Sequence, residues 1–178
     1  MLLKFLKIAV ALAIALTLLV GVGGLLVSPE FTVSRSTVVN APPAAVYALL
    51  SSPRAWKDWT VWNRRDPAMQ LSYSGPEQGA GAVWSWVSAT EGTGRMTFTQ
   101  AEPDRRLAYD LYFPDFDSNS TGELTLTVEG AATRVTWAMR GNAGPNPLMR
   151  WVSLFSDRLI GPDFEAGLAN LKTLAERR

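Results

Sequence analysis

The sequence predicts an α+β domain in which one antiparallel sheet of about seven strands packs against a long C-terminal helix. Apolar side chains alternate with polar ones in short segments between Phe31 and Arg140, and turns rich in Gly, Pro and Asp separate these segments. Helical periodicity dominates only after Pro147. Because the alternation leaves the sheet with one apolar face, the sheet needs one cover, and the C-terminal segment is the only element long enough to supply it.

The C-terminal segment, residues 147–178, is expected to form one amphipathic helix in two parts. Gly161 and Pro162 interrupt the segment, and Pro162 suits the start of the second part because the first turn of a helix does not need its missing N–H. Apolar positions recur at helical spacing on both sides of the interruption. They are Leu148, Trp151, Val152, Phe155 and Leu159 before it, and Phe164, Leu168, Leu171 and Leu174 after it.

The domain is expected to open with a strand over Phe31–Val39, followed by two short helices. The first helix covers Ala44–Leu50, and the second begins with Ser52 as its cap and Pro53 at its first position. For the second helix a lid over a cavity, a membrane-interface contact and core filling all remain open, because it carries amphipathic indoles. These are the side chains of Trp56, Trp59 and Trp62.

Six further strands follow at period two, and their tight connections predict antiparallel pairing between neighbours. They span Met69–Ser74, Ala82–Ser88, Arg95–Gln100, Leu107–Phe113, Gly122–Glu129 and Thr133–Arg140.

The N-terminus carries an apolar run, Ile8–Val27, of 20 residues drawn only from Ile, Ala, Val, Leu, Thr and Gly. At helical rise this run extends about 30 Å, the hydrocarbon thickness of a bilayer. A cleaved secretory signal is the alternative, but the run is long for one and no clear small-x-small cleavage site follows it. We therefore expect an uncleaved single-pass anchor that partners the membrane through residues 8–27.

The anchor divides the chain into residues 1–27 as a transmembrane segment, 28–33 as a short linker and 34–178 as a ligand-binding domain. Lys4 and Lys7 precede the span, so the positive-inside rule places the N-terminus in the cytoplasm and the domain on the periplasmic or extracytoplasmic side.

Charge and composition exclude several classes of function. Residues 1–27 carry two of the 17 basic side chains and no acidic one, so the rest of the chain has 15 basic and 16 acidic side chains. This balance argues against a nucleic-acid-binding surface, which needs an excess of clustered basic side chains. The chain has no Cys and no His, so it cannot form a disulfide, a thiolate or imidazole metal site, or a Ser-His nucleophile. We expect no metal and no cofactor, and the oligomeric state stays open.

Several motifs along the chain are similar to those of one known family. They are Asn40-Ala-Pro-Pro-Ala-Ala-Val-Tyr47, the Trp56–Trp62 run that ends in Asp66-Pro67, Tyr73-Ser-Gly-Pro-Glu77, Trp84-Ser-Trp86, Thr133-Arg-Val-Thr-Trp137 and the stretch from Gly161 to Lys172. Over about residues 31–175 the chain resembles the START-like helix-grip superfamily, also called SRPBCC, in particular its membrane-anchored polyketide cyclase/dehydrase and lipid-transport-like members. The resemblance implies a curved sheet wrapped round the C-terminal helix, with a cavity between them for a hydrophobic ligand.

The ligand-binding residues of that cavity are expected among the large side chains that strand alternation and helical spacing point inward. Plain core packing is the alternative for each of them, since burial alone stabilises such side chains. The expected set is Trp59, Tyr73, Trp84, Trp86, Phe98, Tyr109, Trp137, Met139, Trp151 and Phe155.

We favour a membrane-anchored protein that binds a lipid, a quinone or a polyketide-like compound in this cavity. One alternative is a cyclase/dehydrase-type enzyme using the same cavity, which requires a buried ionisable group with a perturbed pKa. Another is a non-enzymatic envelope interaction or stress module. No catalytic residue is predicted, because the acid–base candidates form no visible pair; alternation points Asp110 outward, and Asp66 before Pro67 fits a turn. The other candidates are Asp58, Tyr73, Glu91 and Tyr109.

Overall fold

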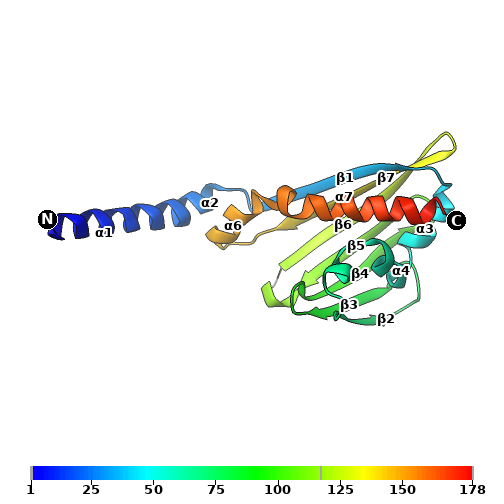
Figure 1. The fold of residues 1–178 in the computed structure, drawn as a ribbon, viewed down its shortest axis with the longest axis horizontal. Coiled ribbons are helices and arrows are strands. Elements are labelled where there is room, and N and C mark those ends of the chain that lie inside the picture. Colours follow the sequence, from blue (N-terminus) through cyan, green and yellow to red (C-terminus); the bar gives the residue numbers. More distant parts are fainter. Residues whose placement is uncertain (1, 117, 178) are drawn as a thin grey trace.

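A seven-stranded antiparallel sheet curves around the C-terminal helix in the computed structural model, which describes residues 2–116 and 118–177 (Figure 1). The order of the strands in the sheet is β1-β7-β6-β5-β4-β3-β2, and every neighbouring pair is antiparallel. The predicted meander is therefore confirmed, with the first strand closing beside the last. The strands are β1 (Glu30–Val39), β2 (Gln70–Ser74), β3 (Val83–Ser88), β4 (Gly92–Glu102), β5 (Arg106–Phe113), β6 (Ser118–Glu129) and β7 (Ala132–Asn142).

Strands β4 and β6 begin earlier than their apolar alternation indicates. β6 starts at Ser118 instead of Gly122, because its polar first residues pair with the end of β5, where Ser118 lies opposite Phe113. β4 starts at Gly92, inside a stretch expected to be a turn, because Gly94 pairs with Trp86. A 3-10 turn, η2 (Pro114–Phe116), follows β5.

Three short helices, instead of two, connect β1 to β2: α3 (Pro43–Leu50), α4 (Pro53–Trp59) and α5 (Trp62–Arg65). Ser52 occupies the N-cap position of α4, but its side chain makes no capping hydrogen bond. The helix ends at Trp59, and the Thr60 hydroxyl donates to the carbonyl of Trp56 over 2.8 Å. Trp62 therefore belongs to α5 and is separated from the other two tryptophans.

The C-terminal helix breaks earlier than predicted. The structure has α6 (Pro147–Ser153) and α7 (Ser156–Ala175), so the interruption falls at Leu154 and Phe155 and not at Pro162. Pro162 lies inside α7 on its exposed side, where water can replace the backbone hydrogen bond that proline cannot donate.

The core lies between the concave face of the sheet and α7. The buried face of α7 includes Phe164, Leu168 and Leu171. Beside this face lie two fully buried side chains of α4, Trp56 and Trp59. The ring of Phe164 stacks on Trp137 of β7 with 3.8 Å between centroids and an angle of 4° between planes. This stack fixes α7 against β7, the strand next to the β1 edge of the sheet.

The N-terminal apolar helix projects away from the domain (Figure 1). It comprises α1 (Leu2–Leu18), a π-helical turn η1 (Leu19–Gly23) and α2 (Gly24–Leu26). The segment Lys4–Leu26 is long and apolar enough to cross a membrane and is only 6% buried, a combination that an anchor and a signal sequence share. β1 begins at Glu30, so residues 27–29 connect α2 to the first strand.

Candidate ligand cavity

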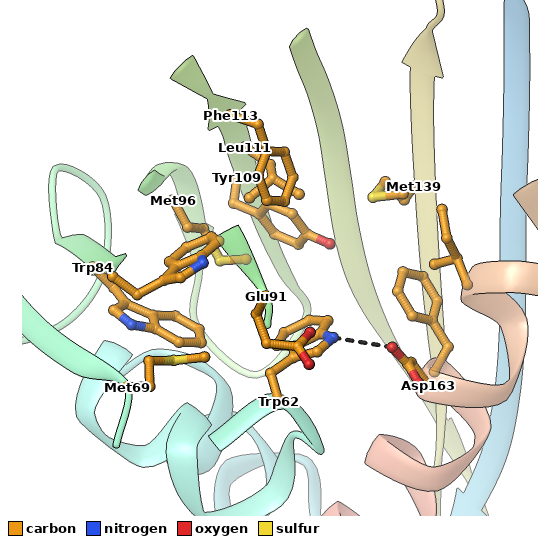
Figure 2. A pocket seen from close by; sticks show the side chains of 13 residues that line it. Trp62, Met69, Trp84, Glu91, Met96, Tyr109, Leu111, Phe113, Met139 and Asp163 are labelled. Carbon is orange, nitrogen blue, oxygen red and sulfur yellow. Dashed lines mark hydrogen bonds between the residues drawn. The ribbon is translucent and has the colours of Figure 1, made fainter. Parts of the chain in front are cut away.

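A cavity of about 150 Å³ lies between the sheet and the N-terminal half of α7 (Figure 2). An engineered apolar cavity of about this volume holds a benzene molecule, whereas pockets for larger ligands reach roughly 300–1,000 Å³. In this conformation the cavity therefore accommodates one ring or a short apolar chain, and a second fused ring requires the segments around the cavity to move apart. Its lining is Trp62, Met69, Trp84, Trp86, Glu91, Met96, Tyr109, Leu111, Phe113, Met139, Ile160, Asp163 and Phe164.

Glycines in neighbouring strands leave this space open. Gly94 lies directly across from Trp86, and Gly122 lies directly across from Tyr109. A Cβ atom at either glycine would overlap the ring opposite it, so both rings lie flat on the backbone of the next strand. The aromatic rings therefore form the floor of the cavity instead of filling it.

The Tyr109 hydroxyl belongs to a buried residue of the cavity wall. It accepts a hydrogen bond from Nε1 of Trp137 over 2.8 Å, and the Tyr109 side chain is 1% exposed. Burial raises the pKa of Tyr109 far above its usual range, so the hydroxyl keeps its proton. Within the described residues this proton has no acceptor, which leaves it free to donate to an oxygen atom of a ligand.

Trp84 supplies a second unused donor. Its side chain is 2% exposed and lines the cavity, while its Nε1 is buried without a hydrogen-bond partner among the described residues. Leaving a buried N–H unpaired costs about 1–3 kcal/mol. The Nε1 atom itself has almost no exposed surface, so a ligand oxygen would recover part of this cost only after the indole ring shifts, whereas a pure hydrocarbon would not recover it.

One edge of the cavity is closed by an ionic cluster that we call the Arg65 clasp, made of Arg65, Glu91 and Asp163. The Arg65 guanidinium donates to Glu91 over 2.9 and 3.0 Å and to Asp163 over 2.8 and 2.7 Å. Trp62 Nε1 donates to the same Asp163 carboxylate over 3.1 Å (Figure 2). The clasp therefore joins α5, the β3–β4 turn and α7.

The carboxylates of the clasp are less exposed than the arginine that pairs them, at 18 and 19% against 46%. The hydrogen bonds that Arg65 donates to Asp163 and, less strongly, to Glu91 raise the pKa of Arg65. Bidentate, charge-assisted pairing orients both carboxylates, but solvent at the arginine screens each pair, so each contributes about 0.2–1 kcal/mol.

The structure brings together some of the sequence-predicted ligand residues. Trp84, Trp86, Tyr109 and Met139 form part of the cavity wall. The remaining buried members of the set pack behind that wall in the core. They are Trp59, Phe98 and Trp137. Contact between any of these residues and a ligand stays a prediction.

Three other residues of the expected set lie outside the cavity. Tyr73 sits near the sheet edge on β2, with the Arg54 guanidinium 4.5 Å from the centre of its ring. Trp151 lies on α6 beside the N-terminal helix, and Phe155 is 50% exposed. The expectation that Trp151 and Phe155 point inward is wrong, because the break before α7 separates their segment from the helix that covers the sheet.

Several cavity residues were not among those predicted. Met96, Leu111 and Phe113 follow the inward alternation of strands that the sequence did predict, so that signal could have found them. Glu91 and Asp163 had no such signal, because their shared partner Arg65 lies 26 and 98 residues away along the chain. The others are Trp62, Met69, Ile160 and Phe164.

Two acid–base candidates have the structural roles that the sequence indicated. Asp110 is exposed on the outer face of the sheet. Asp66 holds a turn, accepting from the backbone N–H of Ala68 over 2.9 Å and from the Ser88 hydroxyl over 2.5 Å.

An antiparallel sheet wrapped round a C-terminal helix, with an apolar cavity between them, defines a helix-grip protein of the SRPBCC type. The chain belongs to the family described as polyketide cyclase / dehydrase and lipid transport, whose profile matches residues 30–176. This family comprises cyclases and proteins that bind hydrophobic small molecules.

Solved structures of other proteins share this fold. Norcoclaurine synthase of Thalictrum flavum matches with a TM-score of 0.64 and 12% identity, covering 84% of this chain and 96% of that one. Protein CV1439 of Chromobacterium violaceum matches with a TM-score of 0.60 and 16% identity, covering 82% of this chain and 98% of that one. The di-domain ARO/CYC StfQ of the steffimycin biosynthetic pathway matches with a TM-score of 0.62 and 14% identity, covering 84% of this chain and 51% of that one. At these identities the likeness shows the fold alone. No curated protein sequence matches this chain significantly.

Proposed function

We propose that this protein binds a hydrophobic small molecule in the cavity between sheet and α7 while residues 1–27 anchor it in a membrane. The observation that carries the proposal is a partly enclosed, mostly apolar space beside two hydrogen-bond donors that lack an acceptor among the described residues, the Tyr109 hydroxyl and the Trp84 indole. Such a combination of apolar walls and few polar groups is typical of small-molecule sites.

The size and chemistry of the cavity favour a ring that carries a carbonyl group. A volume of about 150 Å³ is too small for a whole lipid, and the walls offer aromatic faces from Trp84, Trp86 and Tyr109. Among the lipids, quinones and polyketide-like compounds considered for this fold, a quinone or polyketide-like ring therefore fits best. Its carbonyl oxygen would accept from one of the two unused donors.

Calorimetric titration of the full chain in detergent with 1,4-naphthoquinone tests this proposal. We expect binding to the parent protein and at least about a tenfold loss in Leu111→Trp, which fills the cavity with a larger side chain. Val87→Trp is the matched control, because Val87 is 56% exposed on the outer face of the sheet. Absence of binding, or equal binding in both variants, would refute the proposal.

A second comparison tests the carbonyl. Trp84→Phe should weaken the binding of 1,4-naphthoquinone by about 5- to 30-fold, the equivalent of about 1–2 kcal/mol. The binding of naphthalene should weaken much less, because only the quinone can accept a hydrogen bond from the indole. Trp86→Phe removes the same volume from the same wall and serves as the control. Equal losses for both ligands would assign the Trp84 effect to packing.

The anchor has a separate test. We expect the full-length chain to stay in the membrane fraction after extraction with alkaline carbonate, with the intact mass of residues 1–178. Release into the soluble fraction with loss of the N-terminal segment would indicate a cleaved signal. Labelling of Val128→Cys, 64% exposed, by a membrane-impermeant thiol reagent in intact cells would support the extracytoplasmic side.

Cyclase-type catalysis is the second candidate, favoured by the Glu91 and Asp163 carboxylates at the cavity wall. Arg65 engages both of them, and the raised pKa of Tyr109 makes its hydroxyl a poor general acid or base near neutral pH. These two features favour binding over catalysis as the primary role. Conversion of a bound β-polyketone, followed by mass spectrometry and abolished in Glu91→Gln, would reverse that order.

A further inference from the structure

Exposed apolar side chains gather on α6 and at the start of α7. We call this surface the apolar shelf: Leu148, Met149, Val152, Leu154, Phe155 and Leu159, with exposed fractions of 38 to 62%. In the rest of the domain, over residues 30–115 and 118–177, only Val87 and Val128 are large, apolar and exposed, and they lie singly. A concentration of this kind on one element marks a surface that another phase or molecule covers.

The shelf is attached to the last turns of the N-terminal helix. Trp151 Nε1 donates to the carbonyl of Val20 over 3.1 Å, and Arg150 donates to the carbonyl of Leu25 over 3.0 Å. Gly24 is buried against the backbone of Pro147, where a Cβ atom would overlap it. Figure 1 shows α6 beside α2. The shelf therefore has a defined depth relative to the apolar helix.

That depth places the shelf within a membrane surface if the helix spans the membrane. Val20 and Leu26 are six residues apart, which is about 9 Å along a helix. Trp151 contacts Val20 and so lies about 9 Å below the end of the span, the depth at which tryptophan rings concentrate in membrane proteins. Arg150 can extend its guanidinium toward the polar end of the same helix.

We propose that the apolar shelf is embedded in the interfacial layer of the bilayer that holds the N-terminal helix, so that α6 is a membrane-interface helix. This inference rests on the proposed membrane anchor. Lipid is the molecule that covers the shelf, because the shelf is continuous with the apolar helix. A second copy of this chain or a partner protein is an outcome that the test below would reveal.

The shelf also adjoins the cavity. Ile160, which lines the cavity, directly follows Leu159 of the shelf. The cavity residues Met139 and Phe113 lie toward the end of the sheet where β1 leaves the N-terminal helix, since Met139 pairs with Val33 and Phe113 with the first residue of β6. A ligand dissolved in the bilayer would therefore reach the cavity past the shelf without crossing bulk water.

Because the chain has no cysteine, single-cysteine variants report one position each. The full chain carrying an NBD fluorophore at Leu154→Cys or Phe155→Cys is placed in phosphatidylcholine–phosphatidylglycerol vesicles. Leu16→Cys, in the apolar helix, and Val128→Cys, at the opposite end of the sheet, are the two controls. We expect blue-shifted emission from labels at 154, 155 and 16, with at least twofold stronger quenching by nitroxide-labelled lipid than by iodide. The label at 128 should show no blue shift and should be quenched more strongly by iodide than by the lipid.

Three results would overturn the proposal. Labels at 154 and 155 that behave like the label at 128, while 16 is quenched by lipid, would leave the anchor intact and remove the shelf from the membrane. Protection of 154 and 155 from both quenchers would indicate a protein cover. A water-exposed label at 16 would refute anchor and shelf together.

Ligand exchange distinguishes this inference from the proposed function. We expect Leu154→Ser/Phe155→Ser to bind 1,4-naphthoquinone in detergent like the parent and to acquire it from preloaded vesicles at least about fivefold more slowly. Val87→Ser is the control and should match the parent in both assays. Unchanged transfer would overturn the route through the shelf, whereas failure of the parent to bind in detergent would refute the cavity function and leave the quenching result standing.

Discussion

The hydrogen bond between Trp137 and Tyr109 links the core to the cavity wall at the scale of single residues. Tyr109→Phe keeps the ring and removes the acceptor, which leaves the buried Trp137 N–H unpaired. We expect a loss of about 1–3 kcal/mol in the free energy of unfolding, measured by chemical denaturation. Tyr47→Phe, at a half-buried position, should change stability by less than about 0.5 kcal/mol. Equal effects of the two variants would argue against this pair.

The same tyrosine predicts an alkaline limit to stability. An unfolded tyrosine loses its proton near pH 10, whereas burial keeps the pKa of Tyr109 well above that value in the folded state. Above about pH 10 the unfolded state therefore binds fewer protons than the folded state, and the free energy of unfolding falls by up to about 1.4 kcal/mol per pH unit. Stability is unaffected by this group at lower pH.

Denaturation curves between pH 9 and 11.5 measure this slope. Tyr109→Phe should show a shallower decline than the parent protein. A smaller decline should remain in the variant, because burial also raises the pKa values of Tyr47 and Tyr73. Parallel slopes in parent and variant would contradict the assignment to Tyr109.

Individual residues also mark the limit of what alternation predicts. The inward orientation of Trp84, Trp86 and Tyr109 follows from the period of their strands, and the structure confirms it. That the Trp84 N–H lacks a partner does not follow, since the period fixes the face of the sheet on which a side chain lies and not the acceptors within its reach. The donors that favour a carbonyl ligand are therefore visible only in the folded chain.

At the scale of secondary-structure elements, the glycines opposite aromatic residues shape the cavity. Gly122→Ala introduces a methyl group where the Tyr109 ring lies on β6, so the ring must tilt away and its bond with Trp137 weakens. We expect a loss of about 1–3 kcal/mol in the free energy of unfolding. The double variant Gly122→Ala/Tyr109→Leu removes the ring that the methyl group meets. Its destabilisation should be at least about 1 kcal/mol smaller than the sum of the single effects, and strict additivity would refute the contact.

The break in the C-terminal helix shows how an element boundary can escape sequence analysis. Gly161 and Pro162 resemble an interruption, yet Gly161 is buried inside α7. A Cβ atom there would overlap the Arg35 guanidinium, which crosses the helix to pair with Asp157 and Glu165 over 2.7 and 2.6 Å. Gly161 therefore allows a close approach between α7 and β1. Arg35 lies more than 120 residues away in sequence, so local pattern could not reveal this role.

The order of elements is the part of the whole molecule that the sequence predicted well. Alternation located each strand because every strand has one face in a single core, and tight turns dictated antiparallel neighbours. The volume of the cavity was not predictable in the same way. It depends on flat rings over glycines and on how far the Arg65 clasp holds α7 from α5 and the β3–β4 turn, all of which are long-range contacts.

The clasp predicts how the whole molecule opens for ligand exchange. It connects three segments around the cavity, and a ligand larger than one ring needs these segments to separate. Arg65→Met keeps the length of the side chain and removes both ion pairs. If the two pairs together contribute about 1 kcal/mol, we expect dissociation of 1,4-naphthoquinone to accelerate about fivefold in stopped-flow measurements.

Two controls sharpen this prediction about the clasp. Arg64→Met changes the same charge at the neighbouring position, which is exposed and lies outside the clasp, so it should leave the rate unchanged. Raising the ionic strength should accelerate dissociation from the parent protein, since salt screens partly exposed pairs, and should have little effect in Arg65→Met. If Arg65→Met dissociates at the parental rate, the clasp is a structural tie, and the ligand leaves past the apolar shelf while α5 and α7 stay together.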